Sequence, residues 1–162
     1  MPPSVTPLPS LYTIFFLYIE PIATALGAYY AHFRQDDYMH MTWPTAATAT
    51  ATAPVSTGQS IVLTQLANLY FVFALNEALV LRCTTDRRVW NTFLLGLLIA
   101  DFGHLYSVHA LGGQVYYRFW EWNSMYWGNL GFVYIGATMR TAFLSGLALP
   151  PATDNNNTKL KS

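Results

Sequence analysis

Long apolar runs, separated by short polar segments, dominate the hydrophobic pattern of this chain. Four of them reach the roughly 20 residues that a helix needs to cross a hydrocarbon core of about 30 Å. They cover residues 11–33, 61–81, 89–111 and 126–149. Each run also contains a few polar residues, which is typical of helices that pack together and keep polar groups inside. The pattern predicts an all-α polytopic membrane protein, an antiparallel bundle of four transmembrane helices.

The first run differs from the others because Glu20 and Pro21 interrupt it. Proline has no backbone N–H to donate, and it disfavours helical angles in the residue before it. The sequence therefore predicts a helix that is kinked at Pro21. Residues 1–10 contain no Lys or Arg, so they lack the basic region of a signal peptide, and we expect the first helix to be retained as an anchor.

The segments outside these runs have distinct compositions. Within residues 42–60, Ala and Thr alternate from Ala46 to Ala53 between two prolines, which predicts that the whole segment is a flexible, low-complexity loop. Residues 82–88 form a short polar link, and the link before residue 126 is rich in Trp and Tyr, which favour the membrane–water interface. The expected organisation is an N-terminal tail at 1–10, a four-helix transmembrane domain at 11–149 and a disordered C-terminal tail at 150–162.

Composition supports the membrane assignment and excludes several other classes. The 162 residues are 53% hydrophobic and only 10% charged, whereas about 25% of a typical soluble domain is charged. The formal net charge is zero, so the chain offers no basic surface to nucleic acid. The single cysteine, Cys83, excludes a disulfide framework within one chain. No nucleotide-binding loop, nucleophile elbow or HExxH motif occurs, and no cofactor is predicted.

Basic residues set the expected orientation in the membrane. Four crossings place both chain ends on one side, together with residues 82–88. That side carries the three arginines of this link and two C-terminal lysines, against Arg34 and Arg118 on the other. The positive-inside rule then places both ends in the cytosol. Without a recognisable targeting signal, the expected location is the endoplasmic reticulum membrane.

Charged residues inside the apolar runs are costly in lipid, so each needs a partner or a role. Counted from the cytosolic ends, Glu77 and Arg140 fall at similar depths, which predicts a structural ion pair between the second and fourth helices. Glu20 and Asp101 fall deeper, near the midplane. His104 follows Asp101 by three residues and shares its helix face. The sequence thus predicts two polar layers, with no second cation in the deeper one.

The deeper layer is the candidate site. Two neighbouring carboxyls in a low dielectric cannot both stay ionised, so one holds a proton at neutral pH, as a general acid requires. The candidate catalytic residues are therefore Glu20, Asp101 and His104, for which hydrogen bonding between helices is the structural alternative. The candidate substrate-binding residues are Asn129, Tyr106 and Asn76. Asp101 and His104 also resemble half of a carboxylate-bridged metal site, but no matching pair occurs on another helix, and no metal is predicted.

Two segments of the sequence resemble a known family. They are NEALVLRCTTDRRVWNTFLLGLLIADFGHLY and WGNLGFVYIGATMRTAFL, and they resemble a family of short fungal integral-membrane proteins of unassigned function. Besides the early Glu20–Pro21 pair, the resemblance rests on Glu77, Arg82, Asp86, Trp90, Asp101, His104, Tyr106, Asn129, Gly131 and Arg140. It implies only a loose link to secondary-metabolite pathways. In style the chain is also similar to the membrane-bound terpene cyclases of fungal meroterpenoid pathways and to the emopamil-binding-protein family of sterol isomerases.

These observations lead to two classes of function. In the first, the protein is a membrane enzyme of a terpenoid or meroterpenoid pathway, a cyclase or isomerase that applies acid–base chemistry to a lipophilic isoprenoid. Asp101 or Glu20 donates the proton, His104 orients or reprotonates the donor, and aromatic rings stabilise a cation. Asn129 holds a substrate oxygen. In the second, the protein is a non-catalytic scaffold, a lipid-binding protein or a small transporter. Membrane lipids are partners in both, and assembly with itself or with other membrane proteins is left open.

Overall fold

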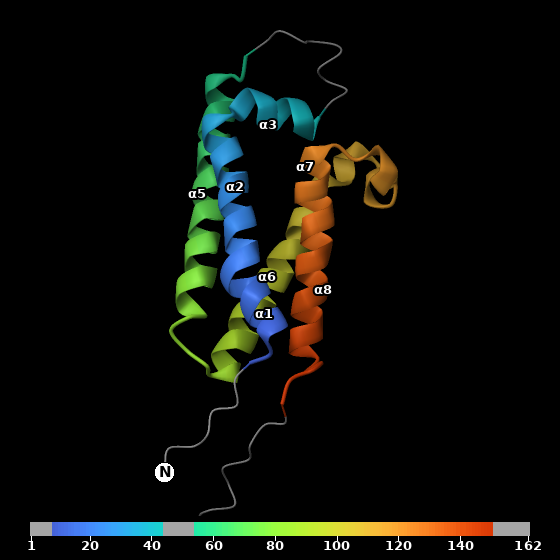
Figure 1. The fold of residues 1–162 in the computed structure, drawn as a ribbon. Coiled ribbons are helices and arrows are strands. Elements are labelled where there is room, and N and C mark those ends of the chain that lie inside the picture. Colours follow the sequence, from blue (N-terminus) through green and yellow to red (C-terminus); the bar gives the residue numbers. More distant parts are fainter. Residues whose placement is uncertain (1–7, 44–53, 151–162) are drawn as a thin grey trace, which may run out of the picture.

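A computed structural model describes residues 8–43 and 54–150 of the chain. All regular elements in these two ranges are helices (Figure 1). The first helical run consists of α1 (Ser10–Ile14), the π-helical η1 (Phe15–Ile19) and α2 (Glu20–Phe33). The short α3 (Gln35–Thr42) and the long α5 (Thr57–Val80) follow.

The second half of the chain begins with α6 (Arg87–Ser107). Three 3₁₀ turns lead away from it: η2 (Val108–Leu111), η3 (Gly113–Tyr116) and η4 (Phe119–Glu121). The last helical run consists of α7 (Ser124–Tyr126), the π-helical η5 (Trp127–Gly131) and α8 (Phe132–Leu144). Wide π-helical turns inside longer helices often mark functional sites, and both of them here adjoin the cavity described below.

Three stretches of the described chain are long and apolar enough to cross a membrane, namely Ser10–Phe33, Thr57–Val80 and Arg87–Leu111. Large apolar side chains such as Ile22, Leu79 and Ile99 are exposed on them, whereas the carboxyl groups of Glu20 and Glu77 are buried inside the molecule. This inverted distribution suits a protein surrounded by lipid. The fourth run predicted from the sequence is helical, but it is not among these three stretches.

The start of α5 differs from the prediction. The helix begins at Thr57, inside the segment 42–60 that was expected to be a loop. Ser56 and Gln59 form a capping box, in which each side chain accepts a hydrogen bond from the other residue's backbone N–H. This Ser-x-x-Gln pattern is a known helix start, and it outweighs the local low-complexity composition. The rest of the predicted loop, at 44–53, and the tails at 1–7 and 151–162 lie outside the described residues.

Helix α3 has no counterpart among the predicted elements. Its one buried residue is Tyr38, which packs against Ala31, Leu63 and Ala67 of α2 and α5. The aromatic anchor therefore holds a mostly polar segment in place by a tertiary contact, which hydropathy along the chain does not reveal.

The long helices form two pairs: α2 lies along α5, and α6 lies along α8 (Figure 1). At the end where α5 and α6 join, which we call the hairpin end, the Tyr12 hydroxyl donates to the carbonyl of Leu147 at 2.9 Å. At the opposite end, which we call the α3 end, Asn123 Nδ2 donates to the carbonyl of Met41 at 2.8 Å. The two helix pairs are thus tied together at both ends.

The hydrophobic core lies at the hairpin end and is largely aromatic. The Trp90 ring meets Phe16 edge-on, with centroids 6.4 Å apart, and stacks on Phe143 at 5.5 Å. Trp90 Nε1 donates to the carbonyl of Thr84 at 2.9 Å, so the one polar atom of this ring is satisfied. We call this cluster the aromatic core; its buried members are Tyr12, Phe15, Phe16, Leu17, Leu81, Trp90, Leu94 and Phe143.

The irregularity expected at Pro21 takes the form of the π-helical turn η1 directly before it. Because Pro21 lacks an N–H, the carbonyl of Leu17 has no α-helical donor. Arg82, just after α5, donates from Nη2 to this carbonyl at 2.8 Å. Its guanidinium carbon also lies 4.6 Å from the centre of the Tyr18 ring. The turn between α5 and α6 therefore supplies the hydrogen bond that Pro21 cannot make.

Candidate functional site

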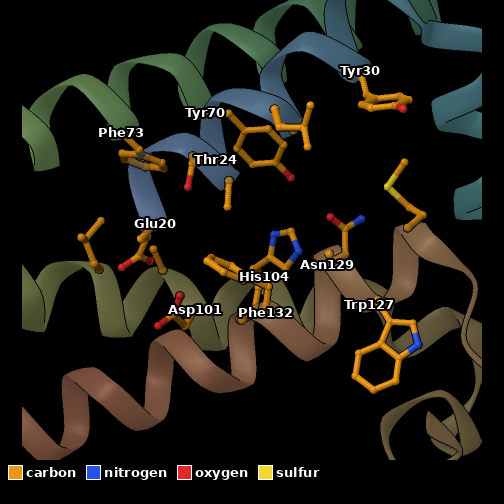
Figure 2. A pocket seen from close by; sticks show the side chains of 18 of the residues that line it. Glu20, Thr24, Tyr30, Tyr70, Phe73, Asp101, His104, Trp127, Asn129 and Phe132 are labelled. Atoms are coloured by element: carbon orange, nitrogen blue, oxygen red, sulfur yellow. The ribbon is translucent and has the colours of Figure 1, made fainter. Parts of the chain in front are cut away.

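A cavity of about 460 Å³ lies between the two helix pairs, on the α3 side of the aromatic core (Figure 2). Its volume falls in the range of about 300–1,000 Å³ that is usual for small-molecule sites. Most of its wall is apolar or aromatic. The ionisable side chains of the wall, tyrosines apart, are Glu20, Glu77, Asp101, His104 and Arg140.

One guanidinium group joins three helices at the hairpin side of this cavity. Arg140 of α8 donates from Nη1 to Asp101 Oδ2 of α6 at 2.5 Å, and from Nη2 to Glu20 Oε1 of α2. The Arg140 side chain is only 3% exposed. Hydrogen bonds between ionised partners are about twice as strong as neutral ones, so this bridge fixes the spacing of α2, α6 and α8. We call these three side chains the ionic bridge.

Gly136 makes room for the ionic bridge. A helical side chain leans toward the N-terminus of its helix, so the Arg140 side chain lies over Gly136, one turn earlier. A Cβ atom at position 136 would lie 2.7 Å from Arg140 Nη1 and 3.4 Å from Glu20 Oε1. Two carboxylates hold the guanidinium, so moving it aside would weaken its ion pairs. Only glycine at position 136 leaves enough space for the Arg140 side chain.

The predicted ion pair between Glu77 and Arg140 is replaced by another arrangement. No salt bridge joins these two residues in the described chain, and Arg140 pairs with Glu20 and Asp101 instead. Depth along each helix was a poor guide, because the long Arg140 side chain extends toward the midplane and reaches the deeper acids. The two predicted polar layers are therefore one cluster, and it does contain a cation.

Glu77 lines the same cavity from α5. It is only 2% exposed, and its Oε1 has no hydrogen-bond partner among the described residues. Removing a carboxyl group from water without a charged partner strongly disfavours its ionised form. Glu77 is thus the acid of the cluster that the ionic bridge leaves without a salt bridge.

His104 and Asn129 line the cavity beyond the ionic bridge, toward the α3 end (Figure 2). His104 comes from α6, and its ring centre lies 6.4 Å from that of Tyr70 on α5. Its Nε2 is buried and has no partner within the described parts of the chain. The structure therefore brings Glu20, Asp101, His104 and Asn129 around one cavity, as the sequence predicted for a single layer.

Two of the predicted substrate-binding residues do not line the cavity. Asn76 is exposed on the outer face of α5, because a shift of one residue from Glu77 turns a helix by about 100°. Tyr106 is 70% exposed and stacks on His109, with ring centres 4.6 Å apart. Neither residue is therefore placed to contact a ligand in the cavity.

The sequence left open whether Tyr70, Phe73 and Phe132 face lipid or stabilise a cation in a pocket, and all three line the cavity, whereas Thr24 and Trp127 were missed. Tyr70 and Phe73 precede Glu77 by seven and four residues and share its helix face, and Thr24 follows Glu20 by four. Trp127 and Phe132 lie in and next to η5 and belong to the same wall. A helical wheel centred on each buried acid would have placed Tyr70, Phe73 and Thr24 on the cavity side of their helices.

The clearest chemical signal of the cavity is a set of buried polar atoms without partners. In the described residues, four such atoms belong to the cavity wall: Glu20 Oε2, Glu77 Oε1, His104 Nε2 and Arg140 Nε. Buried polar atoms are nearly always hydrogen-bonded, so this concentration marks a place where a polar group can bind. No group of three or more His, Cys, Asp or Glu side chains in these residues is arranged to hold a metal ion.

The fold and the cavity define the class: an all-helical protein with three stretches able to span a membrane and an ionic cluster at its centre. The chain belongs to the family described as a domain of unknown function (DUF7704), whose model matches residues 5–150. No curated protein matches the chain, and no solved structure does. The family match covers most of the chain and assigns no chemistry, so function rests on the cavity.

Proposed function

We propose that the protein is a multi-pass membrane enzyme that transfers protons to and from a lipophilic molecule held in the cavity. The reaction type that fits best is the isomerisation or cyclisation of an isoprenoid. One observation carries the proposal: four buried polar atoms, on an acid, a base and the ionic bridge, have no partner among the described residues and converge on one aromatic-lined cavity. Acid–base catalysis needs such groups within reach of a substrate and shielded from water.

The proposal takes the helical run Ser124–Leu144 as a fourth crossing. At about 1.5 Å per residue, this run covers about 30 Å, which matches the hydrocarbon core. The two most polar side chains of its interior, Asn129 and Arg140, line the cavity and so do not face lipid. Four crossings make the bundle antiparallel and place both chain ends on one side, which the positive-inside rule assigns to the cytosol. The endoplasmic reticulum is the proposed membrane.

Charge balance assigns the proton donor. The cavity wall holds three carboxyl groups and one guanidinium group, so the three acids cannot all stay ionised in a low dielectric. Arg140 favours ionised carboxylates at Glu20 and Asp101, whereas Glu77 has no salt bridge among the described residues. We therefore assign the mobile proton to Glu77 rather than to Asp101 or Glu20, the donors that the sequence favoured.

In the proposed reaction, Glu77 transfers its proton to an alkene carbon of the substrate, which becomes a carbocation. The faces of Tyr70, Phe73 and Phe132 and the negative charge of the ionic bridge stabilise this cation. Nε2 of His104 then removes a proton from a neighbouring carbon, and a new double bond forms. A proton transfer from His104 to Glu77 restores the starting state, so the reaction consumes no co-reactant.

The shape of the cavity favours an isoprenoid over a compact polar substrate. The charged side chains lie at its hairpin side, whereas Tyr30 and Trp127 lie toward its α3 end (Figure 2). A ligand therefore places its reacting end at the acids and its body along apolar wall. Branched alkenes fit this requirement, because protonation gives a tertiary cation that needs no counter-ion in contact.

The test uses deuterium transfer, which does not require the product to be known. Vesicles that contain the protein are incubated in D2O with a panel of isoprenoid alkenes, alcohols and epoxides, and mass spectrometry measures deuterium on carbon. We expect incorporation with the wild type and its loss in Glu77→Gln. A matched control is Glu121→Gln, which alters an exposed acid that pairs with Arg118. Equal incorporation in wild type and Glu77→Gln, or none from either with the whole panel, would contradict the proposal.

A second candidate function is non-catalytic: a scaffold, a lipid-binding protein or a small transporter. The observation that favours it is the ionic bridge, which ties three helices and gives Arg140, Glu20 and Asp101 a structural role. In this case Asp101→Asn reduces the yield of folded protein, and no deuterium is incorporated by any variant. Size-exclusion chromatography of the solubilised protein, together with the deuterium assay, separates the two functions.

A further inference from the structure

The outer face of α5 carries three amide side chains. Gln65, Asn68 and Asn76 are all exposed, although α5 is one of the stretches able to span a membrane. Asn68 lies near the middle of this 24-residue helix, so it sits close to the centre of the hydrocarbon layer. None of the three makes a hydrogen bond within the part of the chain that the structure describes. An amide exposed to hydrocarbon is unfavourable until it finds a partner.

These amides belong to a regular seam. Positions 61, 65, 68, 72, 75 and 79 alternate intervals of four and three residues, the heptad spacing by which two helices pack along each other. All six residues are exposed: Ile61, Gln65, Asn68, Val72, Leu75 and Leu79. Asn76 flanks the seam on the same face. We call this set the α5 seam.

The rest of the chain that the structure describes does not use the α5 seam. The buried residues of α5 are Leu63, Ala67, Ala74 and Glu77, and they lie on the opposite face of the helix. That face packs on α2 and lines the cavity. The seam is therefore available for another helix, and changes in it leave the cavity wall untouched.

We propose that the α5 seam is the interface of a homodimer, in which a second copy of this chain packs its own α5 against it. Two copies with the same orientation in a membrane are related by a two-fold axis along the membrane normal, which places each residue beside its own counterpart at equal depth. Asn68 then meets the partner's Asn68, and Gln65 meets the partner's Gln65. An amide both donates and accepts, so two identical amides satisfy each other.

This like-with-like pairing is the reason to choose a second copy over a different partner. A single buried Asn in a heptad seam is a known determinant of dimer formation and register, and amide hydrogen bonds across helices stabilise association in membranes. The apolar seam residues pack between the amide layers. The cavities of the two copies lie on the far sides of the α5 pair, so dimerisation and ligand binding are separable.

The first experiment measures self-association of the full chain. The protein is labelled with donor or acceptor dyes and reconstituted into phosphatidylcholine vesicles, and energy transfer is followed as the lipid-to-protein ratio rises. We expect Asn68→Leu to weaken dimerisation by about threefold to thirtyfold. Thr92→Val, which removes an exposed polar group from α6, is the matched control and leaves the dimer unchanged. Circular dichroism confirms that each variant is folded.

The second experiment locates the interface. In a Cys83→Ser background, which lacks the chain's single cysteine, cysteines are introduced one at a time by Gln65→Cys, Asn68→Cys, Val72→Cys and Phe71→Cys. We expect oxidative cross-links between copies at 65, 68 and 72 but not at 71, which lies off the seam. A protein that stays monomeric at all lipid ratios, an Asn68→Leu dimer as strong as the wild type, or equal cross-linking at 71 would each overturn the proposal.

Discussion

The same helices pack in two different ways at the two sides of the ionic bridge. Toward the hairpin end they close on the aromatic core, where Phe16, Phe143 and Leu94 are fully buried. The polar atoms of this core, the Tyr12 hydroxyl and Trp90 Nε1, both donate hydrogen bonds. Toward the α3 end the helices surround a cavity of about 460 Å³, and four buried polar atoms of its wall have no partner in the described chain.

The difference separates the part of the molecule that stabilises the fold from the part that is available for chemistry. Buried polar atoms without partners lower stability, and proteins keep them where function requires it. The aromatic core must therefore offset much of the stability that is lost at the unpartnered polar atoms of the cavity. Substitutions in the two regions should then differ in size and even in sign.

The largest effect is expected in the aromatic core. Phe16→Ala removes a ring that contacts both Trp90 and Phe143 edge-on, and the closely packed surroundings cannot refill the space. The free energy of unfolding should fall by about 3 to 5 kcal/mol, as measured by denaturant titration in mixed micelles. Phe71→Ala, at a position 51% exposed on α5, is the control and should change stability by about 0.5 kcal/mol or less. If both variants lost the same unfolding free energy, the aromatic core would contribute no more to stability than an exposed position of α5.

The ionic bridge lies between the two regions, and breaking it should cause the second largest loss of unfolding free energy. Arg140→Met leaves Glu20 and Asp101 buried without their cation, which typically costs about 3 to 5 kcal/mol. We expect the lower end of this range, because the carboxyl groups can take up protons. Adding Glu20→Gln and Asp101→Asn to this variant should restore most of the loss in the same titration. A triple variant less stable than Arg140→Met would mean that the carboxylates have other partners.

Gly136 should show a smaller effect of the same origin. In Gly136→Ala, the new Cβ displaces a guanidinium that two carboxylates hold, which should cost about 1 to 3 kcal/mol of unfolding free energy. A Cβ atom at Gly96 of α6 would meet no neighbouring group within 4 Å, so Gly96→Ala should be neutral or stabilising by up to about 1 kcal/mol. If Gly136→Ala and Gly96→Ala change the unfolding free energy by the same amount, then the ionic bridge does not require a glycine at position 136.

The smallest effect on stability, with the opposite sign, is expected in the cavity. His104→Leu removes a buried Nε2 without a partner in the described chain, so the unfolding free energy should stay the same or rise by about 1 kcal/mol. The same variant should lose deuterium incorporation, because the proposed base is gone. A destabilisation as large as that of Phe16→Ala would assign His104 to the structural part of the molecule and remove it from the mechanism.

The helical fold and three of the expected spans could be predicted from the sequence, since twenty-residue apolar runs have few alternatives. Glu20, Asp101, His104 and Asn129 were also recognised as a group, because polar residues in such runs stand out. The start of α5 was missed although Ser56 and Gln59 signal it locally. Helix α3 depends on the contacts of Tyr38 with other helices, and no local pattern reports them.

The sequence by itself thus determined that this chain is helical, apolar outside and polar at a few interior points. Only the tertiary structure decided how those points are connected. Arg140 pairs with Glu20 and Asp101, 120 and 39 residues away, and leaves Glu77 unpaired by any salt bridge in the described chain. The physical reason is that a partner depends on which helices are neighbours and how far a long side chain reaches along its helix. Depth along a single helix contains neither piece of information.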